Sequence, residues 1–147
     1  MGLKFRYEAL LGYRMHLKEK AEIEYSRARQ HLRVLKDELL EYQKEMESTR
    51  NELDGYLREK TDSDNIRNFS HYLGALKIWM AIKEKEIAEA DKQVAKRLEE
   101  LLAATKKFKI MEKLKERDLQ KWKKMLNVME QKQLSEVGVL RHGREFL

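Results

Sequence analysis

Two stripes of apolar residues run along this chain. Alternating steps of three and four residues from Leu11 to Tyr56 meet apolar side chains at eleven of fourteen positions. The same steps from Phe69 to Val139 meet them at fifteen of twenty-one positions. A pattern of this kind is a heptad seam, which is what coiled-coil packing requires. The chain is therefore expected to form long helices that bury one narrow face each.

The two seams do not share one frame. The first frame extrapolates to Gly74, whereas the second seam has its equivalent position at Leu73, so the register slips by one residue. Such a slip turns a helical stripe by about 100°. A continuous coiled coil absorbs insertions of three or four residues, and it absorbs a slip of one poorly. The slip falls on LREKTDSDNIRN, residues 57–68, whose short polar side chains favour turns and helix N-caps.

The expected fold is therefore all-α, a long antiparallel two-helix coiled-coil hairpin, because the nearest partner for each seam is the other helix folded back. A parallel homodimer that continues through the break is the alternative. The expected boundaries within a single domain, residues 1–147, are helix one at about 4–58, a turn at about 59–65 that includes Thr61, helix two at about 66–140 with Ser63 or Asp64 as its N-cap, and a frayed C-terminus.

Helix two is longer than helix one in this fold, so its C-terminal part overhangs. Leu11 would face the region of Met111, and the seam would have no partner beyond about residue 120. An apolar face remains there, formed by Trp122, Met125, Leu126 and Met129. An uncovered apolar stripe indicates a partner-binding site, although a frayed tail is an equally good interpretation.

The composition argues against several classes of function. No cysteine is present, so disulfides and thiolate metal sites are excluded. No apolar run is long enough to span a membrane. The segment Lys106–Lys124 holds nine basic and three acidic side chains, a charge that could attract nucleic acid. Because its bases surround the helix instead of lining one face, a solvated surface explains it better, and no nucleic-acid partner is expected.

Catalytic and cofactor-binding motifs are missing from the sequence. The glycines form no phosphate-binding loop. A two-helix rod also offers no water-excluding cleft that could shift the pKa of a carboxylate toward a catalytic value. The histidines lack the spacing that brings two metal ligands onto one helical face; they are His16, His31, His71 and His142. We therefore expect neither an enzyme nor a bound metal or cofactor.

Aromatic residues near the turn suggest a binding surface. Tyr72 and Trp79 lie seven residues apart beside the second seam, and Tyr42 and Met46 lie at a similar height across the turn. Tyrosine and tryptophan are the usual anchors of protein interfaces. The alternative interpretation is that these side chains only broaden the seam of a thin coiled coil.

Both ends of the chain resemble the FliJ family, a small component of the bacterial flagellar type III export apparatus. The beginning, FRYEALLGYRMHLKEKAEIEYSRA, resembles the opening of that family. The tail, EKLKERDLQKWKKMLNVMEQKQLSEVGVLRHGR, resembles its C-terminal motif: K-x-x-E-R, then a tryptophan, E-Q-K-x-L-x-E and a closing arginine. The resemblance covers nearly all of the chain.

This resemblance implies a hairpin similar to the stalk of the rotary ATPase gamma subunit, at the cytoplasmic face of the inner membrane. Its implied partners are the hexameric flagellar export ATPase, the cytoplasmic domain of the export gate, and flagellar export chaperones. The implied gate-binding residues are Leu39, Tyr42, Met46, Tyr72, Leu76 and Trp79. The implied ATPase-ring residues are Phe5, Tyr7, Leu10, Leu11, Glu116, Arg117, Trp122 and Gln131.

Two other interpretations of the sequence remain open at this point. One is a generic structural coiled coil that serves as a rod or spacer. The other is a stalk protein of the type III injectisome, the virulence counterpart of the same machine, although the two ends resemble the flagellar family more closely.

The hairpin predicts that the chain is a monomer in solution, because each seam is buried within one molecule. Sedimentation equilibrium should therefore return a mass near the 17.7 kDa of one chain. A parallel rod would give twice that mass at all but the lowest concentrations, and this result would contradict the hairpin.

Overall fold

The computed structural model describes residues 5–59 and 62–145, which form two α-helices and no strand. Helix α1 spans Glu8–Arg58 and α2 spans Ser63–Glu145. Both are rich in alanine, leucine, glutamate, lysine and arginine, which favour helix, and neither contains proline, which would break one. Lys4 and Thr61, assigned from the sequence to helix one and to the turn, lie outside the described residues.

The start of α2 differs from the sequence-based expectation. The Asp62 carboxylate accepts a hydrogen bond from the backbone N–H of Asp64 at 3.3 Å, and the Asp62 carbonyl accepts one from Ile66 at 3.4 Å. These are the two bonds of an N-cap residue. The cap is therefore Asp62 and not Ser63 or Asp64, and the helix begins three residues earlier than expected.

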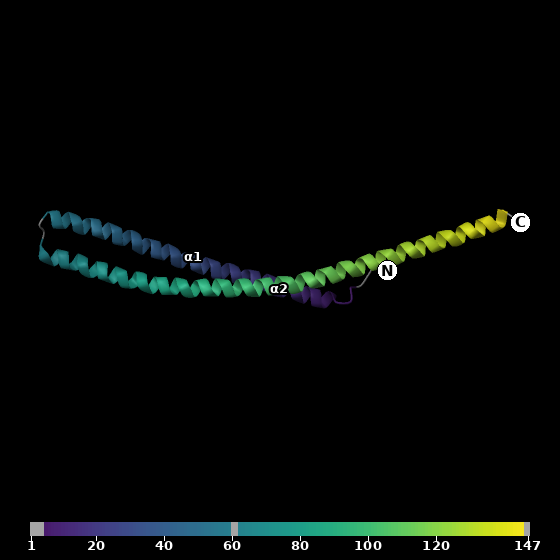
Figure 1. Ribbon diagram of the computed structural model, residues 1–147, viewed down its shortest axis with the longest axis horizontal. Coiled ribbons are helices and arrows are strands. Elements are labelled where there is room, and N and C mark those ends of the chain that lie inside the picture. The colour runs from purple at the N-terminus through teal and green to yellow at the C-terminus, as the bar shows by residue number, and fades with distance from the viewer. Residues whose placement is uncertain (1–4, 60–61, 146–147) are drawn as a thin grey trace. The chain divides into compact units, whose positions relative to one another are not determined.

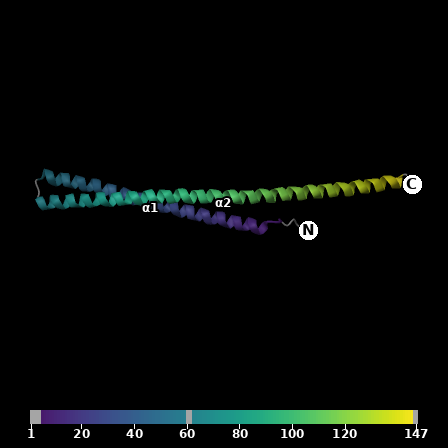
Figure 2. The same cartoon turned by 60° about the horizontal axis from the view of Figure 1, so that its bottom comes forward.

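The chain divides into two compact units, of which unit 2 comprises residues 20–102. Within it, α1 and α2 lie side by side on either side of the turn and run in opposite directions (Figures 1 and 2). The rings of Tyr56 and Phe69 meet near the turn with centroids 5.1 Å apart. Farther from the turn, Glu24 forms an ion pair with Arg97. The pairing is therefore antiparallel and within one chain, so the predicted hairpin is confirmed.

The predicted seams are the contact surface of unit 2. All seam positions of the two helices in this unit are buried or half-buried. Leu76 is the most deeply buried side chain, 1% exposed, and Leu35, Met46 and Ala90 are also buried. Since a coiled coil of two helices has no second layer, most other side chains remain exposed. This thin core leaves both flanks of the seam available to a partner.

Unit 1 comprises residues 1–19 and 103–147. There, Glu8 of α1 forms an ion pair with Lys115 of α2 at 3.2 Å, and Lys18 lies over the Phe108 ring at 5.1 Å. Met111 is buried, as the seam predicts. Lys115 is a predicted seam position that is exposed, whereas its neighbour Leu114 is half-buried, so the contact face has turned slightly there.

Beyond Trp122, α2 continues in unit 1 without a helical partner. Trp122 is half-buried, and every described side chain from 123 to 143 is exposed. Among the described residues of unit 1, no other element lies beside this segment, coloured yellow at its end in Figures 1 and 2. The predicted overhang is therefore present, and α2 extends to Glu145, past the expected end near residue 140. Neither α1 nor α2 carries an apolar stretch that could cross a membrane.

Substitution of Leu76 by alanine should lower the free energy of unfolding by about 2 to 4 kcal/mol, because it leaves a cavity at the most buried position. The matched control is Leu102→Ala on the same helix, where the side chain is 60% exposed and the expected change is within about 0.5 kcal/mol. Urea denaturation followed by circular dichroism measures both. Equal effects would contradict a core centred on this seam.

Candidate functional site

Three aromatic rings form a cluster at the surface of unit 2. The centroid of Trp79 lies 6.1 Å from that of Tyr42 on the other helix and 6.3 Å from that of Tyr72 on its own. Trp79 is 43% exposed and Tyr72 is 38% exposed. Ring contacts restrict both side chains, and restrained aromatic surface is well suited to binding another protein.

A hydrogen bond between the helices fixes one ring of this cluster. The Tyr72 hydroxyl donates to a carboxylate oxygen of Glu45 on α1 at 3.2 Å. Partial burial and the bond to Glu45 raise the pKa of Tyr72 above its ordinary value, so the hydroxyl remains a donor at neutral pH. Sequence reasoning missed Glu45, although its spacing from Glu38 and Glu41 places it on the same face of α1.

The six residues predicted near the turn occupy two layers. Met46 and Leu76 are buried, and Leu39 and Tyr42 are half-buried, so these four hold the two helices together. Only Tyr72 and Trp79 are exposed enough to meet a partner directly. Ile82, one turn beyond Trp79 and 51% exposed, extends this surface and was not among the predicted residues.

The second predicted set lies entirely within unit 1. Phe5 is buried, and its ring meets that of Tyr7 edge-on at 5.9 Å. The guanidinium of Arg6 lies 5.6 Å from the centroid of Tyr7. Of the remaining predicted residues, Leu11 and Trp122 are half-buried, and Leu10, Glu116, Arg117 and Gln131 are exposed.

The apolar face of the unpaired segment follows a different period from the seam. The heptad pattern continues through Lys132 and Glu136, which are charged. Four exposed apolar side chains instead follow Trp122 at the spacing of a straight α-helix, with eighteen residues making five turns: Leu126, Met129, Val137 and Leu140. Four others lie off this line: Met125, Val128, Leu134 and Val139. A period of 3.6 residues does not favour left-handed supercoiling. The charges at Lys132 and Glu136 disfavour a second heptad helix as the partner of this segment.

Cations occupy seam positions of α2 in unit 2, and each meets a glutamate of α1. The Lys83 side chain is only 13% exposed and pairs with Glu38 of α1 and with Glu86 on its own helix. Hydrogen bonds to Glu38 and then Glu86 raise the pKa of Lys83 above its usual value. A charge in a coiled-coil seam is tolerated when a partner reaches it, so such pairs specify register and direction.

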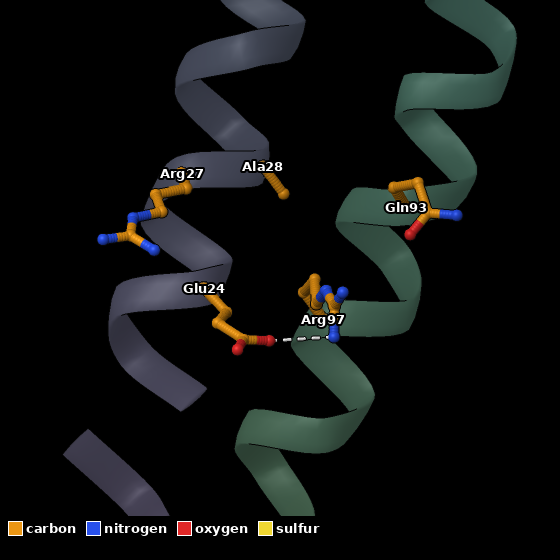
Figure 3. Close-up of a pocket in the computed structure, with 5 residues that line it drawn as sticks. All are labelled: Glu24, Arg27, Ala28, Gln93 and Arg97. Atoms are coloured by element: carbon orange, nitrogen blue, oxygen red, sulfur yellow. Dashed lines mark ion pairs between the residues drawn. The ribbon is translucent and has the colours of Figure 1, made fainter. Parts of the chain in front are cut away.

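A second charged position, Arg97, lies beside a hollow of about 380 Å³ between the helices. Its guanidinium lies 2.9 Å from the carboxylate of Glu24 (Figure 3). Ala28 and Gln93 also line the hollow, while Arg27 points away from α2. The small seam residue Ala28 leaves this space open, and the ion pair closes one end of it. We interpret the hollow as a gap in seam packing, since it lies beside the small seam residue Ala28.

Residues 5–59 and 62–145 contain no group of three or more histidine or acidic side chains that could hold a metal ion. The candidate functional residues in this part of the chain are aromatic and charged side chains on the surfaces of the helices. Such side chains suit binding to another macromolecule.

Comparisons with known proteins support a family assignment. A family model described as "Flagellar FliJ protein" matches residues 3–145, nearly the whole chain. The comparison with curated proteins and that with solved structures found no match.

The seam lysine predicts a pH dependence of stability. Because Lys83 has a raised pKa in the folded state, it adds stability below its ordinary value of 10.5, and this is lost as the pH rises through the higher folded value. The free energy of unfolding of the wild type relative to Lys83→Met should therefore fall as the pH rises above about 10.5, as measured by urea denaturation. Lys77→Met, at an exposed position, is the control. If the difference in free energy of unfolding between the wild type and Lys83→Met does not change with pH, the ion pair in the seam is contradicted.

Proposed function

The chain belongs to the FliJ family of flagellar proteins, and from this we propose that it is a non-enzymatic stalk of the flagellar type III export apparatus. One end of the molecule enters the hexameric export ATPase ring, and a second surface contacts the cytoplasmic domain of the export gate. The stalk thereby helps couple the ATPase to subunit secretion at the cytoplasmic face of the inner membrane. Flagellar export chaperones are further partners.

The observation that carries this proposal is the combination of the family match with a helix that extends beyond its intramolecular partner. From Trp122 onward, α2 presents an apolar face that no described residue of α1 in unit 1 covers. A component that enters a ring needs such a face, because it must exchange contacts with ring subunits without unfolding. We assign this part of unit 1 to the ATPase because both chain ends resemble the family.

The gate contact is assigned to the aromatic cluster of unit 2. Trp79 and Tyr72 are exposed, and ring contacts restrain both. The buried residues below them, Met46 and Leu76, support the surface and are not expected to touch the gate. A residue of this supporting layer therefore affects gate binding through stability, whereas Trp79 affects it directly.

Two substitutions separate the proposed surfaces. Trp79→Ala should weaken binding to the purified gate domain by about tenfold or more, as interface tryptophans do, and leave ATPase binding unchanged. Trp122→Ala should have the reverse effect. Each variant is the control for the other in calorimetric titrations, with circular dichroism to verify folding. If the folded wild type binds neither protein, or if Trp79→Ala retains gate binding and motility, the corresponding assignment is wrong.

A further inference from the structure

One flank of unit 2 carries a row of carboxylates. Glu38, Glu41, Glu45 and Glu52 of α1 follow one another at spacings of three, four and seven residues, which places them on one side of the helix. Two contacts show that this side adjoins α2: Glu38 pairs with Lys83, and Glu45 accepts the hydrogen bond of Tyr72. Glu41, which lies between these two, is exposed.

The edge of α2 along the same flank is aromatic and apolar. Tyr72 joins α2 to Glu45, and Trp79 contacts Tyr72. Ile82 continues this side one turn later and is exposed. Lys83 is the cation at this edge, and Glu38 and Glu86 already neutralise it. The flank is thus apolar on one helix and negatively charged on the other.

The opposite flank of the same unit has a different character. On α1 it carries Lys36, Gln43 and Arg50, each seven residues from the next and therefore on one side. On α2 it carries Lys77 and Glu84, again seven residues apart. Because this side is mixed or basic, the negative charge belongs to the aromatic flank and is not a general property of the coiled coil.

We propose that the acidic–aromatic flank, formed by Glu38, Glu41, Glu45, Tyr72, Trp79 and Ile82, binds a basic amphipathic helix of a partner protein. The apolar side chains of that helix pack on Trp79 and Ile82, as in the docking of an amphipathic helix on an apolar groove. Its lysines or arginines lie over the exposed rings and beside the row of carboxylates. This deepens the proposed gate contact by naming the chemistry of the partner, and to that extent rests on it.

Charge and ring electrostatics both support a cationic partner. The faces of tryptophan and tyrosine attract ammonium and guanidinium groups. Glu45 bonds the Tyr72 hydroxyl, and Glu41 lies four residues before it on the same side of α1. Both carboxylates would add a direct attraction and faster association. The same carboxylates repel phosphate groups, which disfavours nucleic acid and anionic lipid as occupants of this flank.

The test uses a labelled synthetic helix of about 18 residues, five turns long, with leucines at three- and four-residue spacing and lysines elsewhere. A second peptide has glutamate in place of each lysine. Fluorescence anisotropy with the full chain should show binding of the lysine peptide and not of the glutamate peptide. Binding should weaken as sodium chloride rises to about 0.5 M, because salt screens exposed charges.

Matched substitutions locate the binding to this flank. Trp79→Ala should lower the affinity for the lysine peptide about tenfold, which is about 1.4 kcal/mol of binding free energy. The double substitution Glu41→Gln with Glu45→Gln should lower it by a similar factor. Leu98→Ala and Glu84→Gln, at exposed positions on the opposite side of α2, should leave affinity unchanged. Equal binding of both peptides, or equal effects of all four variants, would overturn the proposal.

Two further outcomes separate this inference from the gate assignment and from self-association. If the lysine peptide binds at this flank and the gate domain does not, the partner chemistry stands and the gate assignment fails. If the gate needs Trp79 but tolerates the double glutamine variant and high salt, the gate assignment stands and the basic partner is overturned. Concentration-dependent dimerisation that Trp79→Ala abolishes would assign the flank to a second copy and likewise overturn the proposal.

Discussion

The intramolecular pairing of two heptad seams is the interaction on which the rest of the molecule depends. Each seam is too narrow to hold a helix of this length in isolation, so each needs the other. The one-residue slip between the frames prevents a single continuous stripe, and the Asp62 cap ends the interruption by starting α2. Within unit 2, Lys83 and Arg97 then meet Glu38 and Glu24, and these contacts require the antiparallel direction.

A two-helix core has consequences for its surface. Because only one stripe of each helix is buried, residues beside the seam remain accessible even when they pack on a neighbour. Trp79 is the clearest example, since it contacts two tyrosines and is still 43% exposed. The rings are held in place by the fold and presented to a partner, which is the combination that protein interfaces use.

The unpaired part of α2, beyond Trp122, differs from the paired part in the spacing of its apolar residues. Four of its exposed apolar residues follow Trp122 at the 3.6-residue period of a straight helix, while two heptad positions, Lys132 and Glu136, are charged. Before this segment, in the part of unit 1 where Glu8 of α1 still pairs with Lys115, Leu114 is half-buried while Lys115 is exposed. The charged heptad positions of the unpaired segment disfavour a second heptad helix as its partner.

The sequence alone determined the fold class, because seam periodicity and a register slip are local properties that can be counted along the chain. It also determined the overhang, which follows from the unequal lengths of the two seams. The N-cap at Asp62 was missed because several neighbouring polar residues have similar capping propensities, and backbone geometry selects among them. Only tertiary structure separated the predicted patch into supporting residues such as Leu76 and exposed residues such as Trp79. It also placed the carboxylates of α1 beside the rings of α2, because contacts between helices depend on which flanks meet when the chain folds back.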